Sequence, residues 1–143
     1  MSDPDTSIPA PAATGLFAGL SDEDLAGIRA IGEPASFASE QAVFETGDAG
    51  DGMYIVLSGE ARVDVGGRFH ILKAGDFFGE MALIAPEKRM ATVRAVGDLQ
   101  TLKIPAETFR SFVLEHPTVA LAMMKALVLR LREVEQRIDA WMA

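Results

Sequence analysis

A glycine, a carboxylate and an arginine lie close together near the middle of the chain. Gly79 lets the backbone turn and approach a ligand closely, because glycine has no side chain. The residues that follow, Met81 and Ala82 among them, can form one helical turn whose free amide groups face an anion. Arg89 adds a charged donor fork that suits phosphate oxygens, while Glu80 can accept hydrogen bonds from sugar hydroxyls. An anion site beside a hydroxyl site indicates a nucleotide.

This segment resembles the phosphate-binding cassette of the cyclic nucleotide-binding domain family. That family includes the bacterial catabolite activator, cyclic-nucleotide-dependent protein kinases and cyclic-nucleotide-gated channels. Its cassette typically reads Phe-Gly-Glu, a few small or apolar residues, then Arg-x-Ala, a hydroxyl residue and Val. Pro86 departs from the pattern, because a glycine is frequent at that place. The positions that match are Gly79, Glu80, Ala82, Leu83, Arg89, Ala91, Thr92 and Val93.

The resemblance extends upstream through the glycine-punctuated segments 47–56 and 59–63, and it covers most of the chain from about Leu16. It implies that a cyclic phosphate lies against Arg89, the amides around Ala82 and Ala91, and the Thr92 hydroxyl, with the ribose hydroxyl accepted by Glu80. The family's last helix approaches the base. The ligand-binding residues implied are therefore Gly79, Glu80, Met81, Ala82, Arg89, Met90, Ala91, Thr92, Val134 and Glu135.

The sequence leaves the base open between adenine and guanine. In cGMP-selective relatives the residue after the cassette arginine is often Thr or Ser, and here it is Met90, which favours cAMP. Glu135, by contrast, can accept hydrogen bonds from the guanine N1–H and amino group as readily as from the adenine amine. We therefore expect cAMP or cGMP as the ligand, with a preference for cAMP.

Composition excludes several other kinds of site. The 143 residues, 49% of them hydrophobic, are enough for one packed domain. The absence of cysteine excludes disulfides, thiolate zinc sites and iron–sulfur clusters. His70 and His116 lack a third ligand, so we expect no metal site and no cofactor. No nucleophile–base pair or phosphate-binding loop of nucleotide hydrolases is visible, so we expect no enzyme activity.

Charge and hydropathy bear on partners and location. A formal net charge of −8 disfavours direct nucleic acid binding, which depends on phosphate neutralisation by Lys and Arg. The apolar runs are too short to span a bilayer, and the acidic start of the chain is unlike a secretory signal. We therefore expect a cytoplasmic protein with no membrane partner.

The elements that must position the cassette follow from turn residues and periodicity. Residues 1–14 are expected to form a flexible leader and residues 15–143 one domain, whose first helix begins after Ser21 and ends at Gly32. Short β-runs then extend to Ile104, with two-residue turns expected at Ser58-Gly59, Gly66-Gly67 and Gly97-Asp98. This pattern predicts a mainly β fold with flanking helices, an antiparallel β-roll or jelly-roll barrel. It has a short N-terminal helix, a cassette helix, a helix after Pro105 and a long C-terminal helix over about 117–142.

The long C-terminal helix carries a heptad pattern that predicts a parallel homodimer. Leu121 and Val128 lie on a second face, which we expect to pack on the roll. Glu133 and Arg137 are spaced for an ion pair on a solvated face. The predicted dimer seam consists of Ala120, Met124, Leu127, Leu131, Val134, Ile138 and Trp141.

Three functions remain open. The cassette favours a cyclic-nucleotide sensor whose C-terminal helix moves on binding and so signals to an unidentified protein effector. The first alternative is the sensory half of a regulator of the catabolite activator type, without its DNA-binding region. The second is a dimerisation or interaction module that keeps the fold and has lost ligand binding.

Overall fold

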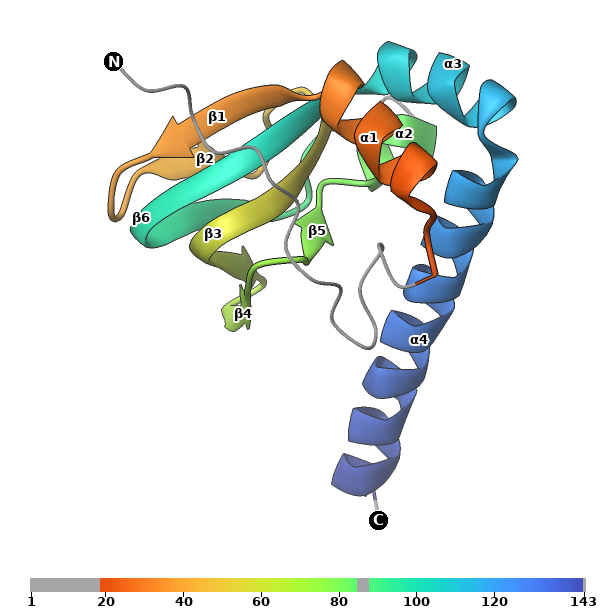
Figure 1. Cartoon of the computed structure of the whole chain (residues 1–143). Coiled ribbons are helices and arrows are strands. Elements are labelled where there is room, and N and C mark those ends of the chain that lie inside the picture. The colour runs from red at the N-terminus through yellow and green to blue at the C-terminus, as the bar shows by residue number, and fades with distance from the viewer. Residues whose placement is uncertain (1–18, 85–87, 143) are drawn as a thin grey trace.

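The computed structural model describes residues 19–84 and 88–142, so the predicted leader lies outside the described residues. The fold is mainly β with flanking helices, as predicted. Figure 1 shows the strands on one side and the helices gathered at one end of the sheet. The strands are β1 (Glu33–Phe37), β2 (Ala42–Phe44), β3 (Gly52–Val65), β4 (Arg68–Leu72), β5 (Phe77–Phe78) and β6 (Thr92–Pro105). The helices are α1 (Asp22–Ile31), α2 (Met81–Ile84), α3 (Ala106–Glu115) and α4 (Pro117–Met142).

The sheet is built on β3 and β6, which pair antiparallel along most of their length. The order is β1-β6-β3-β4, with β2 also paired to β6 and β5 to β3. The predicted turns at Ser58-Gly59 and Gly97-Asp98 are wrong, because each lies inside a continuous strand. Both glycines have positive φ, and the register shifts beside Gly59, so these residues bend the paired strands as bulges rather than reversing them. The turn at Gly66-Gly67 is confirmed, because Val65 pairs with Arg68 across it.

Two apolar clusters hold the strands and helices together. The first lies between the sheet and the helices, and its members come from β3, β5, β6 and all four helices. The second lies inside the β-roll that the six strands form. Here the Tyr54 and Phe78 rings stack with centroids 5.2 Å apart, and the tilted Phe44 ring packs against both. Phe77 is fully buried in the first cluster and its neighbour Phe78 is buried in the second. Because successive strand residues point to opposite faces, β5 ties both clusters together directly before the cassette.

The helix ends follow the predicted signals. Ser21 caps α1 by accepting a hydrogen bond from the Asp24 amide, and α1 ends at Gly32. α3 begins directly after Pro105 and α4 begins at Pro117, with a bend of 114° between the two helices. Within the described ranges, no single helix is long and apolar enough to cross a membrane, and α3 with α4 meets that test only as a bent pair.

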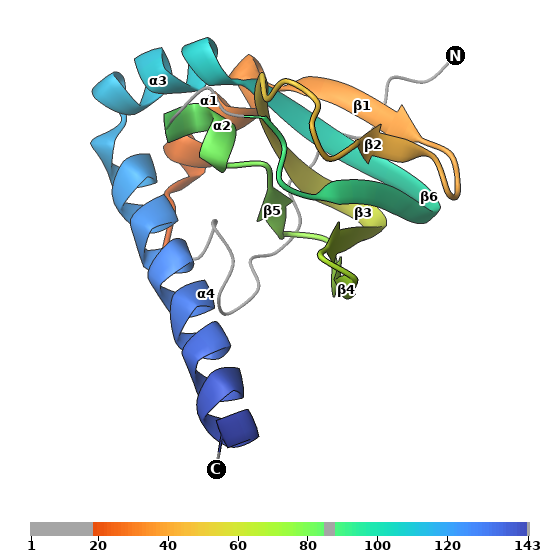
Figure 2. The ribbon, with the colours of Figure 1, turned by 180° about the vertical axis from the view of Figure 1, so that it is seen from behind.

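α4 shows a different face to the roll from the one expected. Val119, Met123 and Ala126 are buried against the core, and Leu127, predicted for the dimer seam, packs partly on the same cluster. Leu121 and Val128, predicted to pack on the roll, are 63% and 50% exposed. The prediction for these two residues is wrong, because the bend after α3 directs the stripe 119–123–126 at the core and turns the neighbouring stripe outward. The second half of α4 runs past the roll (Figures 1 and 2). The exposed stripe consists of Leu121, Met124, Val128, Leu131 and Val134.

Candidate functional site

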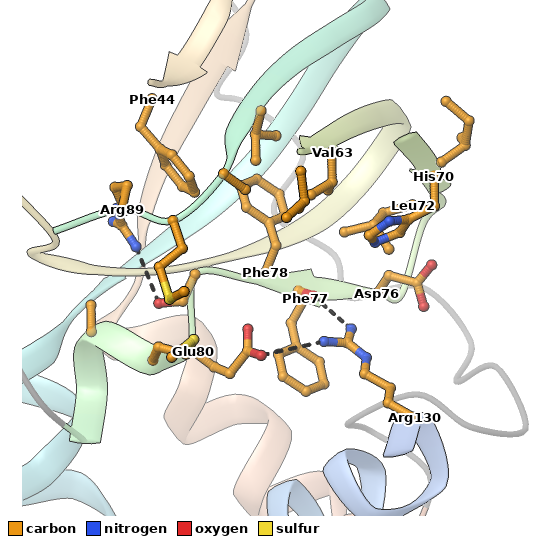
Figure 3. Close-up of a pocket in the computed structure, with 18 of the residues that line it drawn as sticks. Phe44, Val63, His70, Leu72, Asp76, Phe77, Phe78, Glu80, Arg89 and Arg130 are labelled. Carbon is orange, nitrogen blue, oxygen red and sulfur yellow. Dashed lines mark hydrogen bonds and ion pairs between the residues drawn. The ribbon is translucent and has the colours of Figure 1, made fainter. Parts of the chain in front are cut away.

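A pocket of about 690 Å³ lies between the roll and α4. Its walls come from five parts of the chain: Phe44 of β2, the β3–β4 hairpin, the segment from just before β5 through α2, the segment 88–93, and one face of α4. Figure 3 shows Arg89 on one side of this space, Arg130 of α4 on another, and apolar side chains between them. An apolar cavity with a few charged groups on its walls is typical of a small-ligand site.

Arg89 is the most deeply placed charge of the pocket, and its side chain is only 5% exposed. One Nη donates to the Gly52 carbonyl at 2.8 Å and the other to the Gly79 carbonyl at 3.2 Å. The guanidinium lies over the Phe44 ring, 4.0 Å from its centroid. The side chain is thus fixed by three contacts at the end where the roll meets the cassette.

The electrostatics around Arg89 leave part of its hydrogen-bonding capacity free for a ligand. Burial lowers the pKa of Arg89, and the Asp51 carboxylate, 3.5 Å away, acts in the opposite direction. That carboxylate is shared with Lys103 at 2.8 Å, whose hydrogen bond holds the pKa of Asp51 below its usual range. Among the described residues, Arg89 Nε is a buried side-chain polar atom with no hydrogen-bond partner. Such a group is costly to leave unpaired, so a hydrogen-bond acceptor beside it would stabilise the site.

Gly79 is required where the turn before α2 passes beside Arg89. Its φ is +78°, and a Cβ at this position would lie 2.7 Å from Arg89 Nη1 and 3.3 Å from the Gly52 carbonyl oxygen. Any larger residue would therefore be strained in its backbone and would displace the guanidinium.

Glu80 connects the cassette to α4. Its carboxylate lies 3.7 Å from the Arg130 guanidinium, which also donates to the Phe77 carbonyl at 2.6 Å and stacks on the Phe77 ring. Figure 3 shows Glu80 turned toward Arg130 across the floor of the pocket. A carboxylate held in this way presents acceptor atoms to hydroxyl groups at the pocket wall.

The structure brings most of the predicted ligand-binding residues together, and two of them lie outside the pocket. Thr92 is excluded because strand alternation turns it away, and its hydroxyl bonds instead to Thr46 at 3.0 Å. Glu135 is excluded because the helical rotation of α4 presents Arg130, Glu133 and Val134 instead. The predicted residues that line the pocket are Gly79, Glu80, Met81, Ala82, Arg89, Met90, Ala91 and Val134.

The amides of the cassette helix are partly engaged already. The Ala82 amide, expected to face the anion, donates to the Gly79 carbonyl at 3.3 Å, and the Leu83 amide donates to the Glu80 carbonyl at 3.0 Å. The first of these bonds is long, so the Ala82 amide can also be shared with a stronger acceptor.

Sequence reasoning missed several pocket residues. Glu133, assigned to a solvated face, is the α4 carboxylate that lines the pocket, and Arg130 was not singled out at all. Arg130, Glu133 and Val134 follow the three- and four-residue spacing of a single helix face, which was a readable signal. The β3–β4 hairpin adds Val63, Val65, His70, Ile71 and Leu72, a contribution that only the folded hairpin reveals.

Within the described part of the chain, no group of three or more His, Asp or Glu side chains is placed to hold a metal ion. What the pocket does offer is a buried cation, a carboxylate acceptor and a wide apolar wall. This combination suits a small anion that carries hydroxyl groups and a flat apolar ring.

Comparison with known proteins agrees with this chemistry. The cyclic nucleotide-binding domain family matches the chain over residues 34–116, more than half of its length. The cyclic AMP receptor protein of Thermus thermophilus is 30% identical over 130 residues, covering 87% of this chain and 60% of that protein. A cGMP-dependent protein kinase of Toxoplasma gondii is 48% identical over 61 residues, covering 42% of this chain and 6% of the kinase.

Solved structures show the same architecture. The crystal structure of the Thermus thermophilus catabolite activator protein aligns with a TM-score of 0.77 and 30% identity, covering 88% of this chain and 62% of that one. The chain spans about 60% of the length of the curated bacterial regulators that it matches.

Proposed function

This chain belongs to the cyclic nucleotide-binding domain family, and from that premise we propose that it is a sensor that binds cAMP, or cGMP, in the pocket between the roll and α4. We propose further that it acts by changing the position of α4 rather than by catalysis. The Thermus relative is named a cyclic AMP receptor and the Toxoplasma relative a cGMP-dependent kinase, which supports a cyclic nucleotide and leaves the base to be tested.

The observation that carries the proposal is the arrangement of Arg89. Its guanidinium is buried, already fixed in position by two carbonyls and a ring, and its Nε has no partner among the described residues. A cyclic phosphate placed in the pocket supplies that acceptor and a negative charge. Because the donor is held before the ligand arrives, little ordering remains to oppose binding.

Glu80 and Arg130 are proposed to bind the ribose and to link it to α4. The carboxylate has acceptor capacity beyond its pair with Arg130, which is long at 3.7 Å. A ribose hydroxyl that donates to Glu80 changes the strength of that pair, and the Arg130 side chain belongs to α4. A ligand shifts α4 only by the difference in affinity between the two helix positions, and couplings of about 1–3 kcal/mol are typical.

For the base, we propose a preference for cAMP. Met90, directly after Arg89, offers no hydrogen bond to guanine. Glu133, which lines the pocket from α4, replaces Glu135 as the candidate acceptor for the adenine amine. Competition of a fluorescent cAMP analogue with cAMP and cGMP measures the preference, and tighter displacement by cGMP would contradict it.

The proposed output is a change in a homodimer, whose interface is formed by α4 and whose geometry depends on the bound ligand. Four residues of the exposed stripe, Leu121, Met124, Val128 and Leu131, are left uncovered by the core of this chain, and the fifth, Val134, lines the pocket. Their spacing of three and four residues is that of a two-helix seam. The partner proposed for this stripe is the same stripe of a second copy.

The test of ligand binding is the pair Arg89→Ala and Arg132→Ala. Loss of the buried cation leaves the phosphate without its charged partner, which costs about 3–5 kcal/mol, or roughly two to four decades of affinity. Arg132 is an exposed arginine of α4 outside the pocket lining, so its variant keeps the binding and controls for overall charge. Isothermal titration with cAMP compares the two, and equal affinity of the Arg89 variant and the wild type would refute the assignment.

A further inference from the structure

The cassette helix α2 is held from outside the pocket by an arginine of α3. Arg110 Nε donates to the Leu83 carbonyl at 2.9 Å, and its Nη2 contacts the Ala82 carbonyl at 3.4 Å. Arg110 itself is exposed to solvent and does not line the pocket, so it cannot be a ligand contact. Both acceptors are backbone carbonyls of cassette residues.

The Ala82 and Leu83 carbonyls need a hydrogen-bond donor from outside α2. The last four carbonyls of an α-helix have no partner within the helix, and α2 is only four residues long. The side chains of Ala82 and Leu83 are buried, so their backbone lies where water is largely excluded. A charged, planar donor that reaches two successive carbonyls satisfies them and fixes the orientation of the turn.

Apolar packing joins the same two helices. Leu83 belongs to the core cluster that includes Phe109 and Phe112 of α3. From the other side, Arg130 of α4 holds the start of the cassette through the Phe77 carbonyl. The α3–α4 pair therefore contacts the segment 77–84 at both ends, and Arg110 is its polar contact at the α2 end.

We propose that Arg110 is a positioning residue that keeps α2 in the orientation needed for the cyclic phosphate and transmits the occupancy of the pocket to α3. This inference rests on the proposed nucleotide binding. When a ligand shifts the cassette, the Arg110 hydrogen bonds move α3 with it, and α3 continues into α4 through the bend at His116. Without Arg110, α2 loses this polar contact with α3, keeps its apolar packing among the described residues, and samples orientations that bind the phosphate poorly.

The test compares Arg110→Gln and Arg110→Lys with the wild type and with Arg132→Gln as a charge-matched control. Titration with cAMP and cGMP gives the affinity, and hydrogen exchange with and without nucleotide gives the response of α3 and α4. We expect Arg110→Gln to lose about 5- to 50-fold in affinity and most of the exchange response, within the range of known couplings. Arg110→Lys restores part of both, because an ammonium can reach one carbonyl and lacks the planar fork.

The outcomes separate the two proposals. If the wild type binds neither nucleotide, the proposed function fails. If the wild type binds and Arg110→Gln keeps its affinity and its α3–α4 exchange response, the role of Arg110 is refuted while the function stands. If Arg110→Gln lowers the melting temperature and leaves the exchange response unchanged, Arg110 only caps the helix, and the proposal is also refuted. Arg110→Lys supplies the same readouts if the Gln variant does not fold.

Discussion

The change Gly79→Ala tests how closely the cassette turn and Arg89 are fitted to each other. A non-glycine residue at φ +78° costs about 1–2 kcal/mol of backbone strain. For a chain of 143 residues this corresponds to a fall of about 3–8 °C in melting temperature. The new Cβ would also lie 2.7 Å from Arg89 Nη1, and the guanidinium is held by the Gly52 carbonyl and the Phe44 ring, so it must leave its place. Displacing one charge-assisted hydrogen bond of about 1.5–3 kcal/mol lowers nucleotide affinity by roughly one to two decades.

Gly67→Ala is the matched control for this change. Gly67 has φ +82° and nothing within 4 Å of an added Cβ, so the variant carries the same strain without the collision. Thermal unfolding of both variants, followed by titration with cAMP, separates the two effects. Both should lose similar stability and only Gly79→Ala should lose affinity. Equal affinity of the two variants would show that the turn at Gly79 does not position Arg89 for the ligand.

Three further predictions concern the dimer, the core and acid stability. Val128→Lys with Leu131→Lys places like charges in the exposed stripe of α4 and should convert a dimer to a monomer in light scattering with little loss of monomer stability; an unchanged mass would exclude this seam. Phe77→Ala removes a fully buried ring and should lower the free energy of unfolding by about 3–5 kcal/mol in urea titrations, whereas a loss below about 1 kcal/mol would contradict its place in the core. The Thr118 hydroxyl, 2.7 Å from the Asp24 carboxylate, lowers the pKa of Asp24, and His116 does so less strongly. The ionised Asp24 carboxylate therefore stabilises the fold fully above the unfolded pKa of about 3.9, and this stabilisation is lost as pH falls through the lower folded pKa. Asp24→Asn should therefore flatten the acid limb of the stability profile, and an unchanged slope below about pH 4 would count against this linkage.

The parts of the fold that sequence predicts well are those with a local cause. Ser21 and Gly32 bound α1 through their own backbone and capping preferences, and Pro117 opens α4 because proline fits a first turn. At Gly59 and Gly97 the same local reasoning gave the wrong structure, a turn in place of a bulge within a strand. A glycine with positive φ serves a hairpin turn and a bulge equally well, and only the pairing of β3 with β6 decides between them.

The candidate site likewise has a part that the sequence predicts, the cassette, and a part that depends on tertiary structure, the face of α4. The cassette residues are close in sequence, so their spacing predicts that they meet. Thr92 lies outside the pocket, because Ala91 and Val93 on either side of it point into the pocket. The contribution of α4 depends on the 114° bend after α3, which sets the rotation of the helix and brings Glu133 to the pocket in place of Glu135. Pro117 signals where the chain bends, and the spacing shows that Arg130, Glu133 and Val134 share one helix face. The angle of the bend is a tertiary feature, so the sequence does not show which face of α4 meets the pocket.

The central claim is that the pocket binds a cyclic nucleotide, and calorimetric titration of the unmodified chain tests it most directly. Three ligands are needed: cAMP, cGMP and 5′-AMP, the last having the same base and sugar as cAMP but an open phosphate with a second ionisable oxygen. We predict saturable binding of one cyclic nucleotide per chain, with cAMP tightest. We also predict a loss of at least about tenfold, or 1.4 kcal/mol, for 5′-AMP, because the pocket offers one buried guanidinium to a singly charged phosphate. The absence of heat and of any melting-temperature shift with both cyclic nucleotides, or equal binding of 5′-AMP, would contradict the account.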